Sequence, residues 1–199
     1  MKKLDIFIVG VGGQGVLTIG DIIAAAMGQK GYATSFYPTK GMAQRGGFVK
    51  AQLRIGSHLG PNIPPKGADV IISMERSESL KAAPYIKDNT KCIIYGHTWY
   101  PTGVMLGKDH YPKKEAVVER LTACGADVLY LDEENLPNYE GYPMAENIYL
   151  LGGVVAAGVL ADFVSEEDIA SAIAGKWPKG AERNLASFTA GIAAAKALM

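Results

Sequence analysis

Short runs of apolar and β-branched residues alternate with amphipathic stretches over the first two thirds of the chain. Such runs are typical of strands that a parallel sheet buries on both faces, whereas apolar residues at every third and fourth position indicate helices. Apolar and polar residues alternate over 49–55, which predicts a strand buried on one side only. The pattern predicts further strands over 4–9, 32–37, 69–74, 91–96 and 127–132, and helices over 15–30, 77–87 and 113–124.

The last third of the chain predicts three helices, over 145–163, 166–174 and 181–198. Ser165, followed three residues later by Asp168, resembles a capping box at the start of the second of these helices. Alternating strands and helices followed by a helical C-terminal third favour a three-layer α/β/α fold with a mainly parallel, doubly wound sheet. We expect a single domain over residues 1–199.

Composition and charge narrow the function classes. The 199 residues are 48% hydrophobic and 20% charged, as in a globular protein, and 20 basic side chains balance 20 acidic ones. Zero net charge disfavours a strongly basic nucleic-acid-binding protein. The longest uncharged run, residues 148–161, is shorter than the about 20 residues that cross a bilayer. With no signal-peptide pattern at the N-terminus, we expect a cytoplasmic protein without a membrane contact.

Two cysteines without a C-x-x-C pair cannot hold an iron–sulfur cluster or a structural zinc unaided. Cys92 and Cys124 are expected to fill the core, and Glu133 and Glu134 to lie in a solvated loop. The histidines show no metal spacing, so solvated or structural roles are expected for His58, His97 and His110. We predict no metal site and no catalytic residue in this chain.

A glycine-rich segment, Gly10 to Gly15 (G-V-G-G-Q-G), stands between a predicted strand and a predicted helix. Small residues and a helix N-terminus suit an anion such as a phosphate. A dinucleotide fold also places an acidic residue at the end of the second strand, but here residues 36–40 contain none, which disfavours NAD. Lys40 and Arg45 leave NADP open, and close packing of a helix on a sheet is the alternative without a ligand.

A second glycine-rich segment, Lys40 to Gly47 (K-G-M-A-Q-R-G-G), connects two predicted strands. In an open α/β sheet it should converge with the first segment at the carboxyl ends of the strands, where ligands bind. Two cations and an amide suit an anionic ligand or a carboxylate of a partner, and a solvated surface loop is the alternative. The candidate binding residues are Gly12, Gly13, Gln14, Gly15, Lys40, Gln44, Arg45, Gly46 and Gly47.

Both glycine segments resemble the gamma-subunit family of 2-oxoacid:ferredoxin oxidoreductases, and within it most closely the small subunits of indolepyruvate ferredoxin oxidoreductases. Two later segments agree, Asn147 to Gly152 (N-I-Y-L-L-G) and Asn184 to Gly191 (N-L-A-S-F-T-A-G), so the resemblance spans nearly the whole chain. Lys40 stands where the family often has His, and Ala43 where it often has Ser, which leaves the 2-oxoacid open.

The resemblance implies a non-thiamine small subunit, inactive alone, of an enzyme of anaerobic metabolism. Such enzymes decarboxylate a 2-oxoacid oxidatively, form an acyl-CoA and pass electrons to ferredoxin. It also implies no tightly bound cofactor in this chain, a contact with CoA, and a large partner subunit that carries thiamine diphosphate and iron–sulfur clusters.

Two other functions stay open at this point. The chain is either a stand-alone NADP-binding reductase of Rossmann type, or an assembly module whose glycine segments only seat a partner. Single residues are equally ambiguous: Gln14 binds a ligand or caps a helix, and Asn147 and Asn184 bind or merely stand near helix starts.

Overall fold

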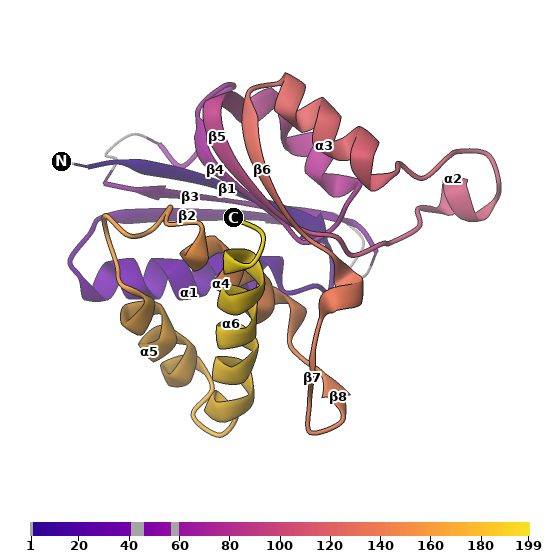
Figure 1. Ribbon diagram of the computed structural model, residues 1–199. Helices are drawn as coiled ribbons and strands as arrows, with labels where there is room; N and C mark the ends of the chain where they lie inside the picture. The colour runs from indigo at the N-terminus through magenta and orange to yellow at the C-terminus, as the bar shows by residue number, and fades with distance from the viewer. Residues whose placement is uncertain (1, 41–45, 57–59) are drawn as a thin grey trace.

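A six-stranded sheet in the order β2-β3-β1-β4-β5-β6 forms the centre of the computed structural model, which describes residues 2–40, 46–56 and 60–199 (Figure 1). β1 pairs in parallel with β4, β4 with β5, and β5 with β6, whereas β3 runs antiparallel to both β1 and β2. The link from β2 to β3 is too short for a parallel crossover, which needs a dozen or more residues. Five of the six strands therefore share one direction, and the predicted mainly parallel sheet is confirmed. The strands are β1 (Leu4–Val11), β2 (Thr34–Lys40), β3 (Phe48–Ile55), β4 (Ala68–Ser73), β5 (Ile86–Tyr95) and β6 (Ala126–Leu131).

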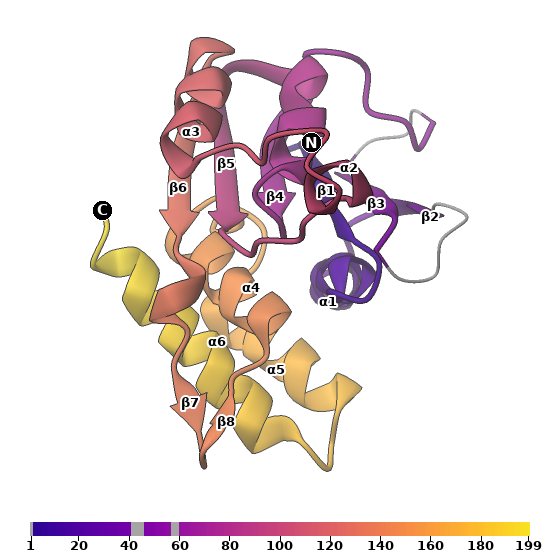
Figure 2. The same ribbon diagram turned by 90° about the vertical axis from the view of Figure 1, so that its right-hand side faces the viewer.

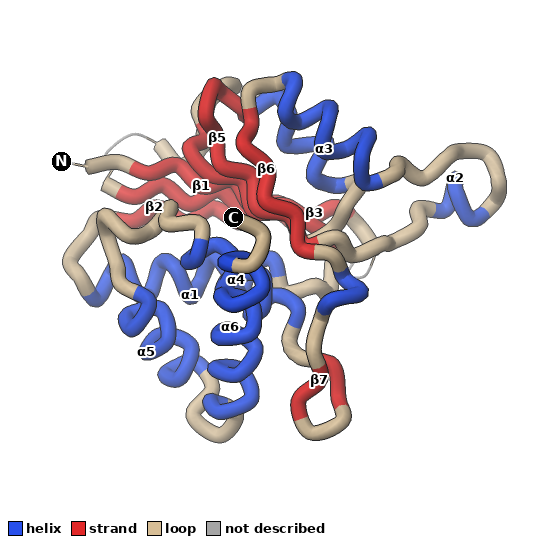
Figure 3. The backbone as a smooth tube through the Cα atoms, in the orientation of Figure 1, coloured by secondary structure: helices blue, strands red, loops and turns tan. Residues whose placement is uncertain are grey.

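Helices cover both faces of the sheet, which confirms the three layers (Figures 1 and 3). One face carries α1 (Val16–Gln29), α4 (Glu146–Ala156), α5 (Glu166–Lys176) and α6 (Ala181–Lys196), and the other carries the 3-10 helix η1 (Glu78–Tyr85) and α3 (Lys114–Ala123). A buried apolar cluster lies on each side, because the central strands are apolar on both faces. The predicted helical C-terminal third contributes most of the first layer.

The C-terminal helices differ from the sequence prediction in length but not in kind. The helix predicted to run to residue 163 ends at Ala156, because Gly158 adopts φ +73° just beyond the C-cap residue Ala157. The predicted capping box of α5 is confirmed, with the Ser165 side chain accepting the Asp168 N–H and the Asp168 side chain accepting the Ser165 N–H. Within the described residues, no helix is both long and apolar enough to span a bilayer.

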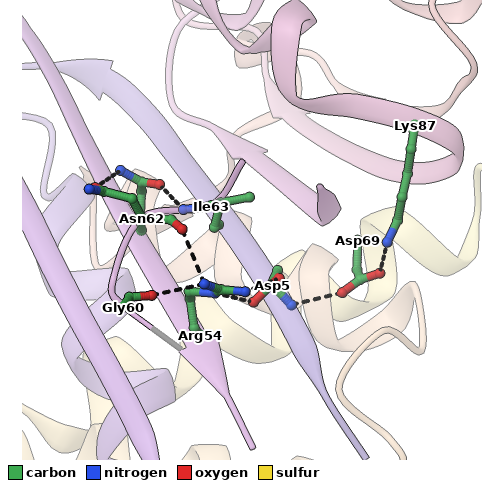
Figure 4. A network of polar contacts seen from close by, with 8 residues as sticks. Asp5, Arg54, Gly60, Asn62, Ile63, Asp69 and Lys87 are labelled. Atoms are coloured by element: carbon green, nitrogen blue, oxygen red, sulfur yellow. Dashed lines mark hydrogen bonds and ion pairs between the residues drawn. The ribbon is translucent and has the colours of Figure 1, made fainter. Parts of the chain in front are cut away.

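The prediction that β3 is buried on one side only is wrong. Gln52 and Arg54 are 3% and 7% exposed although they point away from the apolar face. Arg54 donates to both carboxylate oxygens of Asp5 and to the carbonyls of Gly60 and Asn62 (Figure 4). Polar side chains of β3 therefore hold the segment from residue 60 onward over the sheet, and their hydrogen bonds satisfy groups that would otherwise be orphaned.

Three short elements lie outside the predicted pattern. They are the helix α2 (Thr102–Met105), the 3-10 turn η2 (Glu133–Asn135), and a hairpin of β7 (Asn138–Tyr139) and β8 (Tyr142–Pro143) (Figure 2). α2 belongs to residues 97–113, which leave the end of β5, project from the body of the molecule and return to α3 (Figure 1). We call residues 97–113 the arm.

Candidate functional site at the carboxyl edge of the sheet

The two glycine segments meet directly at the carboxyl end of β1. The Gly12 N–H donates to the Gly47 carbonyl over 2.8 Å, and the Gly46 N–H donates to the Gly12 carbonyl over 3.4 Å. The predicted convergence is confirmed for these residues. We call Gly12–Gly15 with Gly46 and Gly47 the glycine edge. Residues 41–45, among them Gln44 and Arg45, lie outside the described residues, as does the side chain of Lys40, the last residue of β2.

Gln14 closes the first glycine turn from within. Its Oε1 accepts the Val11 N–H over 2.8 Å, while the Gln14 N–H donates to the Val11 carbonyl over 3.2 Å. Its Nε2 is buried and has no hydrogen-bond partner among the described residues. One half of the Gln14 amide therefore shapes the turn, and only the other half is left for a further partner.

The N-terminus of α1 is the electropositive part of the glycine edge. Its N-cap residue, Gly15, has φ +79° and provides no side-chain cap, and the first turn of α1 contains no acidic residue. The first N–H groups of a helix have no partner within the helix, and they carry about half a positive charge. An anion or a carboxylate is therefore favoured at this position.

Asn147 lies against the glycine edge although it is 132 positions from Gly15 in sequence. A Cβ at Gly15 would stand 2.5 Å from the Asn147 Nδ2 atom and 3.2 Å from its Cβ. Gly15 is thus required both by its positive φ and by the neighbouring side chain. This contact gives Asn147 a packing role beside the site, beyond its place in the first turn of α4.

We expect Gly15→Ala to destabilise the fold by about 2 kcal/mol, because alanine is strained at this φ and also meets Asn147. Gly13→Ala is the matched control, since Gly13 has φ +103° but no described atom lies within 4 Å of its Cβ position. Urea unfolding of both variants measures the difference. An equal decrease in the free energy of unfolding of the two variants would show that the Asn147 side chain moves aside without cost.

A fully buried carboxylate follows β4 and organises the neighbouring loops. Glu75 Oε2 accepts the Ser77 hydroxyl over 2.8 Å and the Glu78 N–H over 2.7 Å. Its Oε1 accepts the Trp99 N–H over 3.2 Å and the Tyr111 hydroxyl. Trp99 and Tyr111 belong to the two ends of the arm, so one carboxylate fastens both ends of the arm to the sheet.

A second carboxylate cluster surrounds His97 at the end of β5. His97 Nδ1 lies 3.5 Å from Glu133 Oε2 and 3.4 Å from Glu146 Oε1. The hydrogen bond to Glu146 raises the pKa of His97 above its ordinary value and outweighs the opposite effect of burial. Glu133 also accepts the Thr98 N–H and hydroxyl, so the expectation of a solvated loop is wrong for Glu133, although Glu134 is exposed.

The raised pKa of His97 predicts that stability falls as the pH rises. An imidazolium held by two carboxylates contributes its full stabilisation below the unfolded pKa of about 6.5 and loses it as the pH passes the higher folded pKa. We expect a loss of about 1 kcal/mol in the free energy of unfolding. Urea titrations of wild type and His97→Gln from pH 6 to 9 measure it. Two parallel pH curves would contradict the prediction.

The remaining candidates have structural positions. Cys92 is buried in β5, and burial raises its pKa to about 12, which suits a core thiol rather than a nucleophile. Cys124 is the C-cap residue of α3, and Asn184 lies in the first turn of α6. His110 is exposed on the arm, and His58 lies outside the described residues. No group of three or more His, Cys, Asp and Glu side chains in the described chain is arranged to hold a metal ion.

Residue-by-residue reading of the sequence did not single out Glu75, and it gave His97 only a solvated or structural role. Each lies two residues after the end of a parallel strand, Glu75 after Ser73 and His97 after Tyr95. Polar residues directly after buried parallel strands gather at one edge of the sheet. That position in the sequence was the signal that could have found them.

Residues 5–194 of this chain match the protein family described as "Pyruvate ferredoxin/flavodoxin oxidoreductase". The "Indolepyruvate oxidoreductase subunit IorB" of Archaeoglobus fulgidus is 36% identical over 150 residues, which cover 75% of each chain. The protein of the same name from Thermococcus kodakarensis is 31% identical over 204 aligned positions, which cover 100% of this chain and 99% of the relative.

Two solved structures have the same fold. Pyruvate oxidoreductase subunit PORC from Thermotoga maritima superposes with a TM-score of 0.71 at 18% identity, covering 98% of this chain and 97% of that one. The 2-oxoglutarate:ferredoxin oxidoreductase of Magnetococcus marinus, solved with 2-oxoglutarate, coenzyme A and succinyl-CoA, superposes with a TM-score of 0.62 at 22% identity. This chain is covered completely and spans 32% of that longer one. Because the sequence matches extend from the first strand to the last helix, this chain belongs to the pyruvate ferredoxin/flavodoxin oxidoreductase family.

Proposed function

We propose that this chain is the small, non-thiamine subunit of a 2-oxoacid:ferredoxin oxidoreductase that acts on indolepyruvate or another aryl pyruvate. The observation that carries the proposal is the alignment with the Thermococcus kodakarensis subunit, which leaves almost no part of either chain unmatched. A relative that aligns over its whole length supports a similar role for this chain. A cytoplasmic location goes with this proposal.

The carbon and electron chemistry belongs to a larger partner under this proposal. Thiamine diphosphate there supplies a carbanion stabiliser for decarboxylation, and iron–sulfur clusters pass the electrons to ferredoxin. The two cysteines of this chain do not form such a site, since Cys92 is buried in the core and Cys124 closes a helix on the same side of the sheet. This chain supplies a preformed surface to that partner.

We assign the glycine edge, with Lys40, Gln44 and Arg45, to an anionic group at that surface, either CoA or a carboxylate of the partner. Support comes from the uncapped N-terminus of α1 and from the hydrogen bonds that hold Gly12 against Gly46 and Gly47. Preformed N–H donors bind an anion without paying for reorganisation. The CoA-bound relative of the same fold makes CoA the first ligand to test.

The sheet topology disfavours the stand-alone NADP reductase. In a dinucleotide fold the second strand lies directly beside the first, so that its end reaches the ribose. Here β3 lies between β1 and β2, which moves the end of β2 one further strand, about 4.8 Å, away from the glycine turn. Titration with NADPH tests this alternative, and micromolar binding to the isolated chain would favour the reductase.

Co-expression with the large subunit of the same host tests the proposed function. We expect CoA-dependent reduction of ferredoxin by indolepyruvate from the complex, and none from either chain alone. A chain that purifies without a thiamine- and iron-containing partner would contradict the proposal. Arg45→Ala then separates the two uses of the glycine edge: an increased Michaelis constant for CoA in an intact complex indicates ligand binding, whereas failed assembly indicates an assembly module.

A further inference from the structure

The arm carries a concentration of exposed apolar side chains. Eight large hydrophobic residues are exposed in the described parts of the chain. Four of them lie in one eight-residue stretch of the arm, residues 99–106. They are Trp99, Tyr100, Met105 and Leu106, at 42%, 53%, 68% and 63% exposure. Scattered exposed apolar residues need no explanation, but a cluster on a projecting element marks a contact surface.

Met105 and Leu106, at the tip of the arm, do not pack on the rest of the fold. No residue of α2 is buried, and the arm projects from the side of the sheet and helices in Figure 1. Trp, Tyr and Met are enriched at the centres of protein interfaces, where their desolvation contributes most of the affinity. The composition of the arm therefore fits a protein partner.

The arm is nevertheless held in one conformation. Its tip is closed by main-chain hydrogen bonds from Met105 to Pro101 and from Lys108 to Gly103, of 3.0 and 2.8 Å. At its base the rings of Tyr100 and Tyr111 meet edge to face with centroids 5.1 Å apart. An element that is ordered before binding loses little conformational entropy on docking.

The arm and the glycine edge form one continuous surface. A Cβ at Gly46 would stand 3.4 Å from Trp99 Nε1, so the Trp99 indole lies beside the glycine edge. The same indole faces the His97 ring, with centroids 6.4 Å apart. A partner that contacts the glycine edge therefore also reaches the arm.

The charges on the arm indicate the rim of the partner's binding surface. Lys108 and Lys113 are exposed and form no ion pair with a described residue, whereas Lys114 is paired with Asp132. Lys108 lies near the apolar tip and Lys113 at the base of the arm, with the exposed Asp109 between them. These three side chains leave one excess positive charge, which is complementary to an acidic group at the rim of an apolar groove.

We infer that the arm is a docking element, and that Tyr100, Met105 and Leu106 enter an apolar groove with an acidic rim on the large subunit. This inference rests on the proposed function, which supplies the partner. Beyond that function, we assign the anchoring contacts of the small subunit to the arm, which is fastened at Glu75 and lies next to the glycine edge.

The test is assembly of the full-length Met105→Ser/Leu106→Ser variant with the large subunit. We expect dissociation to be at least 10-fold faster than for wild type, with unchanged thermal melting of the isolated chain because α2 buries nothing. Tyr142→Ser is the matched control, since Tyr142 is 67% exposed on the β7–β8 hairpin. Lys108→Glu/Lys113→Glu should slow association, most strongly at low salt.

Each other outcome overturns the inference. Wild-type affinity in the Met105→Ser/Leu106→Ser variant would show that the arm is not the anchor, while leaving the proposed function intact. An isolated chain that dimerises through the same residues would assign the arm to a second copy. A wild-type chain that binds no large subunit would remove the proposed function and the docking arm together.

Discussion

Replacing Gly191 by alanine should lower the free energy of unfolding by about 3 kcal/mol, the largest effect of a single methyl group that we expect in this chain. A Cβ at Gly191 would lie 1.8 Å from the Tyr149 carbonyl oxygen and 2.7 Å from its carbonyl carbon. Both atoms belong to the backbone of α4, so no side chain can move aside. The two helices must separate, and they are packed on the core of the sheet. Thermal unfolding should shift down by roughly 6–12 °C.

A second helical glycine provides the matched control for this prediction. Gly175 lies in α5, and no described atom outside its own helical turn lies within 4 Å of its Cβ position. Alanine is the better helix former by up to about 1 kcal/mol, so Gly175→Ala should leave stability unchanged or raise it. If Gly191→Ala unfolds at the same temperature as wild type, α4 and α6 adjust to the added methyl group more easily than their contact indicates.

This helix contact explains the later glycines of the sequence. Gly152 in α4 faces the Phe188 carbonyl, 2.2 Å from where its Cβ would stand, and Gly191 in α6 faces α4 in return. Sequence reasoning assigned the segments around them to the family resemblance. The structure shows that Gly152 and Gly191 let two helices of the same chain approach each other closely.

Local sequence patterns were sufficient to predict the layers of the fold. The central strands are apolar on both faces, and that pattern depends on nothing outside each strand. The same local reading failed at β3, where Gln52 and Arg54 occupy the polar positions of an alternating pattern and were therefore predicted to face water. Their burial depends on the segment from Gly60 to Ile63 folding back over them, a long-range contact that alternation alone does not encode.

Only the glycine-rich part of the candidate site was predicted from the sequence, for a similar reason. Glycine-rich segments are visible locally because they need special backbone geometry, so Gly12 and Gly46 could be identified. Glu75 and His97 belong to no recognisable sequence motif, and their role arises only because β4 and β5 are neighbours in the sheet. Sequence reasoning also could not predict the arm, because its four-residue helix is too short to show a helical period.

Removing the Glu75 carboxylate should have the second large effect. In Glu75→Ala the hydroxyls of Ser77 and Tyr111 can turn to other acceptors, but the N–H groups of Glu78 and Trp99 cannot. A buried donor without a partner costs about 1–3 kcal/mol, so we expect a loss of about 2–3 kcal/mol in the free energy of unfolding. The arm should also lose its fixed conformation, because both of its ends are released.

Two measurements distinguish loss of the anchor from general destabilisation. Amide hydrogen exchange should accelerate in residues 97–113 far more than in β1 or β4, since local opening then no longer breaks the Glu75 contacts. Glu75→Gln keeps one acceptor oxygen and should recover part of the stability and of the protection. Glu134→Ala, which removes an exposed carboxylate, should change neither. If exchange instead increases evenly over the sheet, Glu75 supports the whole fold and the arm is ordered by other contacts, such as those of Thr98 with Glu133.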